Sequence, residues 1–159
     1  MPKKITLTQG KIVIVDDEDY DWIRQWKWCA AKDHQCFYAV RGIWIKGTYK
    51  AIRMHRQILN PPPNKEVDHI NGDGLDNRRC NLRISTRSQN GANKRAQQRE
   101  KTSQYKGVRW CKEVQKYRAY IKVNGRQKHL GYFNSEEVAA QVYNKFATEY
   151  FGEFARLNF

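Results

Sequence analysis

The stretch from Val67 to Asn90 constrains this chain more than any other. It places a carboxylate beside a histidine, Asp68-His69, and follows them with a series of amide side chains that ends at Asn90. Carboxylate and amide oxygens hold hard divalent cations, and a histidine beside such a cation can take a proton from water near neutral pH. Strongly basic sequence follows, which suits a phosphate backbone. Together these parts predict a metal-dependent nuclease.

Short sequence blocks in this region resemble the HNH endonuclease motif of phage and intron-borne homing endonucleases. They are Met54-His55-Arg56, Val67-Asp68-His69-Ile70-Asn71-Gly72, Leu75-Asp76-Asn77-Arg78, Asn81-Leu82-Arg83 and Gln89-Asn90. Their order and gaps match that family over residues 54–93, and Asn90 replaces a histidine, as it does in some homing members. The resemblance implies a ββα-metal fold, with a strand from Val67, a long loop, a strand at 82–84 and a helix from Ser85 or Thr86 to about Arg99.

The same resemblance implies roles for four side chains. Asp68 and Asn90 would ligate the metal, His69 would be the general base, and Asn81 would hold either the His69 ring or the site loop. Because adjacent strand residues point to opposite faces, Asp68 and His69 need a twist or a strand end to share one site. The structural alternatives are a turn-capping Asp68, a core His69 and a helix-surface Asn90, and for His55 we favour a structural or phosphate-contact role.

The cofactor implied by the family is a divalent metal ion, with Mg²⁺ as the first expectation and Mn²⁺ as a substitute. One carboxylate and one amide leave most of a magnesium shell to water and phosphate oxygens, which is usual for that ion. Such a site would cleave a phosphodiester bond to leave 5′-phosphate and 3′-hydroxyl ends. One active site would cut one strand.

The positive charge is concentrated in one part of the sequence. The net charge is +14, and residues 78–131 carry 16 Lys/Arg against 2 Asp/Glu. A basic belt in a protein of pI ≈ 9.8 is typical of nucleic-acid binding. The alternatives are a solvated charged surface without a partner and attraction to an anionic membrane. We expect double-stranded DNA as the partner and no membrane.

The cysteines do not form a zinc-binding pattern. Cys29, Cys36, Cys80 and Cys111 give no C-x-x-C pair, so no structural zinc is expected. The sequence contains no signal peptide and no apolar run of about 18 residues. We therefore expect reduced thiols and a cytoplasmic protein, in the cytosol of a bacterial host if a phage encodes it.

Residues 1–53 are predicted to form a small β-rich region. Alternation on both sides of Gln9-Gly10 favours a hairpin, and the acidic run 16–19 favours a helix start over a calcium site. Further strands are predicted at 27–31 and 37–45, and a helix at 51–59 ends at the proline-rich segment 60–64. Core packing, or alternatively base stacking, is expected of six aromatic side chains: Trp22, Trp26, Trp28, Phe37, Tyr38 and Trp44.

Residues 105–159 are predicted to form a three-stranded antiparallel sheet packed on one helix. Strands are expected at 107–110, 117–123 and 127–130, with a two-residue turn at Asn124-Gly125. Asn134 or Ser135 would cap the helix, and its apolar face would contain Val138, Ala139, Val142, Tyr143 and Phe146.

This C-terminal part resembles the DNA-binding domain of plant ethylene-response factors, the Apetala-two-like type. The blocks are Tyr105-Lys106-Gly107-Val108-Arg109, Tyr117-Arg118-Ala119-Tyr120-Ile121, Leu130-Gly131-Tyr132-Phe133 and Glu137-Val138-Ala139-Ala140. In that family the sheet lies in the major groove and the helix packs behind it. An acidic contact residue of that family is replaced here by Tyr120, so the base preference does not transfer.

Alternation within the middle strand predicts which side chains would face DNA. Arg118, Tyr120 and Lys122 share one side, and the apolar residues between them match the helix. Their expected companions on the neighbouring strands are Lys106, Arg109, Gln127 and His129, while phosphate contacts are expected from Lys94, Arg95, Arg99 and Lys101. A solvated sheet face is the alternative.

The predicted fold class is α+β. The expected parts are the β-rich region 1–53, the ββα-metal HNH module 54–99, a linker 100–104 and the sheet-plus-helix domain 105–159. The leading hypothesis is a site-specific DNA endonuclease, and its rivals are a non-catalytic DNA-binding regulator with a degenerate HNH fold and, ranked lower, an RNA-binding or RNA-cleaving protein. The sequence leaves open whether the protein is a monomer or a homodimer.

Overall fold

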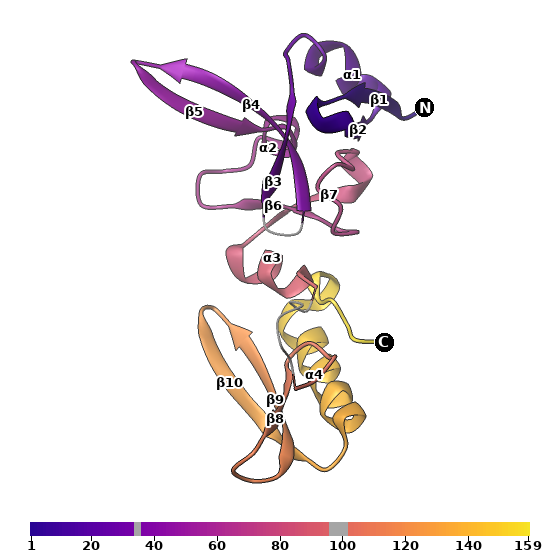
Figure 1. Ribbon diagram of the computed structural model, residues 1–159, viewed down its shortest axis with the longest axis vertical. Helices are drawn as coiled ribbons and strands as arrows, with labels where there is room; N and C mark the ends of the chain where they lie inside the picture. Colours follow the sequence, from indigo (N-terminus) through magenta and orange to yellow (C-terminus); the bar gives the residue numbers. More distant parts are fainter. Residues whose placement is uncertain (34–35, 96–101) are drawn as a thin grey trace. The chain divides into compact units, whose positions relative to one another are not determined.

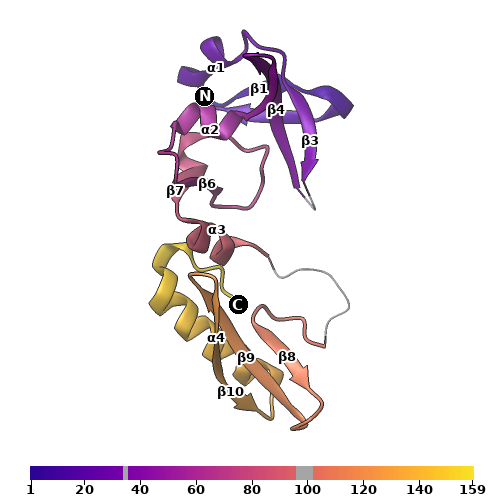
Figure 2. The same cartoon turned by 90° about the vertical axis from the view of Figure 1, so that its left-hand side faces the viewer.

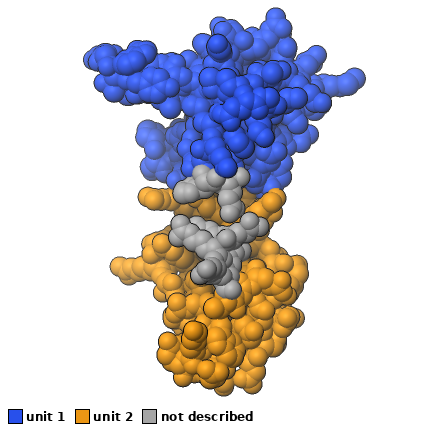
Figure 3. All heavy atoms as spheres, in the orientation of Figure 1, with its two compact units in different colours: residues 1–85 blue, residues 86–159 orange. Residues whose placement is uncertain are grey.

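The structure, a computed structural model, describes residues 1–33, 36–95 and 102–159. The chain divides into two compact units, unit 1 with residues 1–85 and unit 2 with residues 86–159 (Figure 3). Helices and small antiparallel sheets occur in both units (Figure 1), so the fold is α+β as predicted. No helix in these described ranges is long and apolar enough to cross a membrane.

The described residues of unit 1 form three small antiparallel sheets and two short α-helices. A hairpin of β1 (Lys3–Thr6) and β2 (Ile12–Val15) precedes α1 (Asp17–Ile23). A three-stranded sheet of β3 (Cys29–Asp33), β4 (Cys36–Ile45) and β5 (Thr48–Arg53) leads into α2 (Met54–Leu59). The last sheet pairs β6 (Glu66–His69) with β7 (Leu82–Ser85), with a short 3-10 helix, η2 (Arg79–Asn81), before β7.

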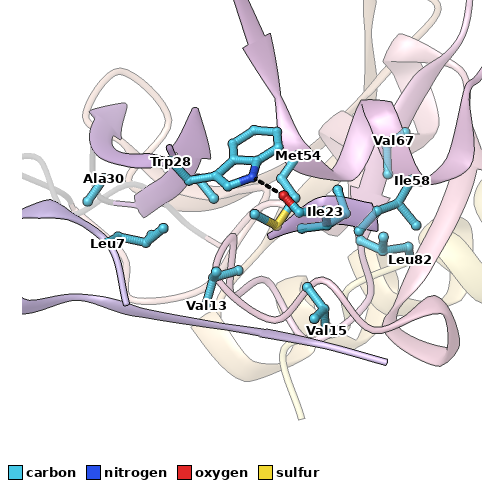
Figure 4. Close-up of a cluster of buried hydrophobic side chains, with 11 residues drawn as sticks. Leu7, Val13, Val15, Ile23, Trp28, Ala30, Met54, Ile58, Val67 and Leu82 are labelled. Atoms are coloured by element: carbon cyan, nitrogen blue, oxygen red, sulfur yellow. Dashed lines mark hydrogen bonds between the residues drawn. The ribbon is translucent and has the colours of Figure 1, made fainter. Parts of the chain in front are cut away.

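The core of unit 1 gathers apolar side chains from almost every element of the unit. Val13, Ile23 and Met54 are completely buried, and Trp28 packs beside them (Figure 4). The indole Nε1 of Trp28 donates to the carbonyl oxygen of Ile23 at 2.9 Å, so the ring is buried without leaving its N–H unpaired. Val67 and Leu82 belong to the same cluster, which anchors the β6–β7 pair to the core.

The acidic run at the start of α1 binds an arginine. Arg79 donates from its guanidinium to both carboxylate oxygens of Asp19 at 2.8 Å and lies 2.8 Å from Glu18. Its backbone N–H donates to Asp16 at 2.7 Å, so Asp16 ties down η2 and does not cap α1 with its side chain. The carboxylates therefore hold the loop before β7 against α1.

Two predictions for unit 1 are wrong. The segment expected to be helical from residue 51 is extended as far as Arg53, because β5 pairs with β4, and the helix begins at Met54. Trp28 is buried in the core, and Trp22, Trp26 and Phe37 pack against that cluster, but Trp44 is 74% exposed and lies outside it. The predicted hairpin around Gln9-Gly10 and the short helix after it are confirmed.

Unit 2 begins with α3 (Arg87–Asn93) and continues into a sheet with one long helix. Strands β8 (Val108–Cys111), β9 (Lys116–Val123) and β10 (Arg126–Phe133) form an antiparallel sheet with β9 in the middle. Helix α4 (Glu136–Phe151) lies along one face of this sheet (Figures 1 and 2), followed by a 3-10 turn, η3 (Gly152–Phe154). The three-stranded sheet with its helix is therefore present.

The pairing of β9 with α4 follows from the alternation of the strand. Ala119 and Ile121 are buried against Ala139, Ala140 and Tyr143 of the helix. Asn124-Gly125 forms the turn to β10 with φ values of 51° and 81°, as the sequence predicted.

Helix α4 starts one residue after a capping serine. The Ser135 hydroxyl accepts from the backbone N–H of Val138 at 3.2 Å, which satisfies one otherwise unpaired donor. Val138 itself is 43% exposed, so its predicted place on the apolar face is wrong.

The compact units divide the chain at residue 85, whereas the sequence placed a module boundary at 100–104. Residues 100 and 101 of that linker, and the predicted helical residues 96–99, lie outside the described residues. Helix α3 ends at Asn93, so Lys94 and Arg95 are not helical. The division into sequence modules stays a prediction.

Replacing Ile23 with alanine should destabilise unit 1 strongly. Ile23 is completely buried, and removing a buried branched side chain leaves a cavity that costs about 2–5 kcal/mol. Urea unfolding followed by tryptophan fluorescence measures the change. Ile12→Ala is the matched control, because Ile12 is 48% exposed and should lose far less. Equal losses in the two variants would contradict this account of the core.

Candidate functional site

The β6–β7 pair determines where Asp68 and His69 lie. In its register Asp68 stands opposite Arg83, and His69, the last residue of β6, stands opposite Leu82. All three residues from Val67 to His69 are buried. The strand thus brings a carboxylate and an imidazole into the interior of unit 1, where unpaired polar groups are costly.

Asp68 is a buried carboxylate held by an arginine. The Nε and Nη2 atoms of Arg83 both lie 2.9 Å from its Oδ2, and the residue is 4% exposed. The guanidinium compensates the buried charge and fixes the orientation of the carboxylate. Carboxylate oxygens accept several partners each, so this arrangement is compatible with a hard cation bound to the same group.

His69 is oriented by an amide that is itself completely buried. Its Nε2 lies 2.9 Å from Oδ1 of Asn77. The tautomer with the hydrogen on Nε2 fits this contact, because an amide Oδ1 accepts, and that tautomer leaves the lone pair on Nδ1. Burial lowers the pKa of His69 below its usual value, and the bond to Asn77 and the charge of Asp68 oppose that shift. The arrangement favours a neutral imidazole, the form able to accept a proton.

Two aromatic neighbours enclose the His69 ring. His55, from α2, meets it edge-on with ring centroids 4.9 Å apart, and Tyr38, from β4, lies 5.9 Å away. Burial is the main cause that lowers the pKa of His55 to about 3, with additional effects from His69 and nearby arginines. Among the described residues its Nδ1 has no hydrogen-bond partner. His55 is therefore an uncharged side chain that lines the site beside His69.

The loop between β6 and β7 is held mainly by Asn81. Its Nδ2 donates to the carbonyl of Asp76 at 2.8 Å and to the side-chain oxygen of Asn71 at 3.1 Å, while its Oδ1 accepts from the Asn71 backbone at 3.0 Å. Two roles were expected for Asn81, holding the His69 ring or holding the site loop. Its hydrogen bonds are to the loop. The contact to the His69 ring comes from Asn77 instead.

Asp76 and Gly74 attach the same loop to the rest of unit 1. Asp76 accepts two bonds of 2.7 Å from Arg78, which is the main reason that its pKa is lowered. A Cβ at Gly74 would lie 2.5 Å from the carbonyl oxygen of Phe37 and 2.6 Å from the Tyr38 ring, so only glycine fits there. Backbone bonds of Ile14 with Leu75 and Asn77 complete the attachment.

Asn90, the second expected metal ligand, belongs to unit 2. It is half-buried in α3, whose start is fixed by a capping box between Thr86 and Gln89. The structure therefore brings Asp68, His69, Asn77 and Asn81 together within unit 1. The pairing of Asp68 with Asn90 stays a prediction.

Helix α3 is bound to the rest of unit 2 by packing and by its last carbonyls. Ala92 packs with Ile121 and Tyr143, and its carbonyl oxygen accepts from the backbone N–H of Arg156 at 3.2 Å. The ammonium group of Lys106 donates to the carbonyls of Ala92 and, at 2.8 Å, of Lys94. Lys106 thus precedes β8 and lies at the end of α3, not on the sheet face as the sequence suggested.

The sheet face away from α4 is positively charged. Arg109 of β8 stands directly opposite Arg118 of β9, and Arg118 donates to His129 at 3.2 Å. Lys122 and Gln127 are exposed and stand opposite each other, and His129 stands opposite Tyr120. Facing like charges destabilise a sheet, and among the described residues neither arginine has an ion pair. The face is therefore suited to an anionic partner.

Other expected phosphate contacts are only partly described. Lys94 and Arg95 are exposed after the end of α3, whereas Arg99 and Lys101 lie outside the described residues.

Comparison with known proteins places this site in a family. A family model described as HNH endonuclease matches residues 60–92. An uncharacterized HNH endonuclease of Acanthamoeba polyphaga mimivirus is 33% identical over 138 residues, which cover 83% of this chain and 71% of that relative. The chain belongs to the HNH endonuclease family. Protein 3.8 of Escherichia phage T7 is 32% identical over 116 residues, covering 70% of this chain and 94% of that protein. No solved structure matches the chain significantly.

Within the HNH region, sequence reasoning missed the part played by Asn77. Asp and Asn side chains favour turns, so the sequence indicates only a loop-shaping role for Asp76 and Asn77. The signal that could have found Asn77 is its place in the block 75–78 of the HNH motif, eight residues after His69. Spacing alone does not show that a loop folds back onto a strand end.

Replacing His55 with glutamine should reduce the pH dependence of stability. The folded-state pKa of about 3 lies below the ordinary 6.5, so between these values the unfolded chain binds a proton that the folded chain does not. Stability should be retained above pH 6.5 and be lost as the pH falls, by on the order of 1 kcal/mol per pH unit. Urea unfolding between about pH 5 and pH 8 measures this slope.

His129→Gln serves as the control, since that side chain is exposed on β10. It should keep the slope of the wild-type protein. His55→Gln should keep part of it, because burial shifts the pKa of His69 in the same direction. The same slope in wild type and His55→Gln would refute the assignment of His55 as a buried neutral group.

Proposed function

We propose that this protein is a metal-dependent endonuclease that hydrolyses phosphodiester bonds in double-stranded DNA. The proposal rests on one observation above the others: a buried histidine whose Nε2 is engaged by Asn77 stands next to a buried carboxylate. An imidazole fixed in this tautomer can take a proton from water, and a neighbouring carboxylate can hold a cation. Membership of the HNH family supports the same reaction.

His69 would act as the general base through Nδ1. Asn77 would keep the ring in the required tautomer and orientation, as a hydrogen-bonded partner does in other acid–base sites. Asn81 would act through the loop, because its side chain binds the backbone N–H of Asn71 and the backbone carbonyl of Asp76. The attacking water would give a proton to the imidazole and form a new bond to phosphorus as the bond to the 3′ oxygen breaks. The 3′ oxygen would take a proton from solvent, which leaves 5′-phosphate and 3′-hydroxyl ends.

Asp68 and Asn90 would hold the metal, and both offer hard oxygen donors suited to Mg²⁺ or Mn²⁺. Arg83 would keep the Asp68 carboxylate in place in the absence of the cation. When bound, a divalent cation supplies stabilisation of the charge on the phosphate and on the leaving oxygen. The structural module for this arrangement would be the ββα-metal fold, formed by β6, β7 and α3.

Unit 2 would bind duplex DNA through the sheet face opposite α4. Arg118, Tyr120 and Lys122 of β9 would face the groove, with Arg109, Gln127 and His129 on the neighbouring strands. Lys94 and Arg95 would contact phosphates. The absence of an ion pair for Arg109 and Arg118 among the described residues supports an anionic partner, and the resemblance to plant ethylene-response factors supports duplex DNA.

The first test is cleavage of supercoiled plasmid or phage DNA in the presence of Mg²⁺ or Mn²⁺. Cutting that stops when a chelator is added supports the proposal. His69→Ala should lower the cutting rate by about 100-fold or more, because a positioned general base contributes that much, and should leave DNA binding intact. Tight, salt-dependent binding by the wild type without any cutting would favour a non-catalytic DNA-binding regulator, and undiminished cutting by His69→Ala would refute its role as the base.

The sheet face is tested by Arg118→Gln. The variant would lose a groove contact worth about 1–3 kcal/mol and one cation near the phosphates, so it should bind duplex DNA more weakly and with a smaller slope of log affinity against log salt concentration. Electrophoretic mobility shifts over a salt series measure both quantities. Lys145→Gln on α4 is the matched control and should behave as the wild type, since the helix lies on the other face of the sheet. Equal behaviour of the two variants would contradict the proposed surface.

A further inference from the structure

The turn end of the β4–β5 hairpin carries two aromatic side chains on its outside. Trp44 is 74% exposed and Tyr49 is 58% exposed, and they stand opposite each other in the strand register. Their ring centroids lie 5.7 Å apart at an interplanar angle of 70°. Figures 1 and 3 show this end of the hairpin extending beyond the rest of unit 1. We call residues 43–50 the hairpin tip.

The local sequence holds this aromatic pair in place without burying it. A Cβ at Gly42 would lie 2.4 Å from the Tyr49 ring, so the ring packs directly on the glycine backbone. Lys46 and Gly47 form the turn with φ values of 48° and 75°, the left-handed pair typical of tight hairpins. Tryptophan is highly buried on average, and exposed apolar clusters mark binding surfaces. The tip is therefore arranged for contact with a partner.

The charge around the aromatic pair is entirely positive. Residues 36–53 contain four Lys or Arg and no Asp or Glu. The two arginines near the base serve the fold: Arg53 donates to Asp33 at 2.7 Å, and Arg41 donates to Gln57 at 3.0 Å and lies over the Trp26 ring. Lys46 and Lys50 at the tip have no ion pair among the described residues. Lys46 lies in the turn next to the aromatic pair, and Lys50, which stands opposite Ile43, lies on the other face of the ribbon. These two lysines are the cations that remain available.

We propose that the hairpin tip is a second DNA-binding site of this protein, separate from the sheet of unit 2 and from the catalytic residues. A two-stranded β-ribbon fits a DNA groove. In the groove of a duplex the bases present their edges, so the aromatic pair contacts sugars and thymine methyl groups. Lys46 and Lys50 contact flanking phosphates. This site rests on the proposed action on DNA.

A second copy of this chain is a poorer occupant of the tip. Two identical tips would bring Lys46 and Lys50 of each copy together without an opposing carboxylate, and like charges repel. Duplex DNA supplies the missing charge and also offers sugars and thymine methyl groups to the aromatic rings. DNA has both properties along its whole length.

The test compares the affinities of three variants for a short mixed-sequence DNA duplex. Binding is measured by fluorescence anisotropy over a salt series with a chelator present, so that cleavage does not interfere. Trp44→Ser combined with Tyr49→Thr should weaken binding by about fivefold or more, as loss of aromatic contact residues does at interfaces, with an unchanged salt slope. Lys46→Gln combined with Lys50→Gln should lower the slope by about two. Val138→Ser combined with Lys145→Gln, on exposed positions of α4, should match the wild type.

Each outcome decides the proposal. If the aromatic variant keeps the wild-type affinity for DNA and an unchanged circular dichroism spectrum, the proposal is overturned. If a tip variant changes the molecular mass measured by sedimentation but not the DNA affinity, the tip binds a second copy of the chain instead. Weakened binding together with wild-type folding supports it. Chelator-sensitive plasmid cutting is measured separately, so a protein that binds DNA through the tip but never cuts would refute the endonuclease function and leave the tip proposal standing.

Discussion

The hydrogen bond between His69 and Asn77 is the contact on which the candidate active site depends. It forms only because the loop from residue 70 to residue 81 folds back over the end of β6. Asn81 ties that loop to itself, Arg79 ties its end to α1, and Gly74 lets it pass close to β4. Loss of any of these attachments would free Asn77 and, with it, the orientation of the imidazole. The site is thus supported by bonds within the loop and by its contacts with α1 and β4.

Charge is treated differently in the interior and on the surface of this protein. Buried carboxylates meet arginines: Asp68 meets Arg83, Asp19 meets Arg79 and Asp76 meets Arg78. A buried carboxylate without such a partner would cost several kcal/mol. On the outer sheet of unit 2 and at the hairpin tip, by contrast, cations stand beside one another or beside aromatic rings. The first pattern stabilises the fold, and the second pattern suits binding of a polyanion.

Much of the local structure followed from short-range rules. Alternation placed Ala119 and Ile121 against the helix, and the turn at Asn124-Gly125 formed where it was expected. The errors occurred where tertiary contacts override local preference. Residues 51–53 have a helical pattern but pair with β4. Trp44 is a large apolar residue of the kind usually found in a core, but it lies at the exposed end of a hairpin that extends beyond the core. Lys106 was expected on the sheet and instead binds the end of α3.

The sequence by itself indicated the HNH family, because its short blocks occur in the order and at the gaps of that family, and it contains Asp68, His69, Asn81 and Asn90, on which the proposed chemistry depends. It also determined the basic character of residues 78–131, since charge is a property of composition. Only the tertiary structure decided which amide meets His69, that α3 packs with unit 2, and which aromatic side chains remain outside. Those outcomes depend on contacts between residues far apart in the chain. Neither the spacing nor the periodicity of a sequence specifies which distant residues will come into contact.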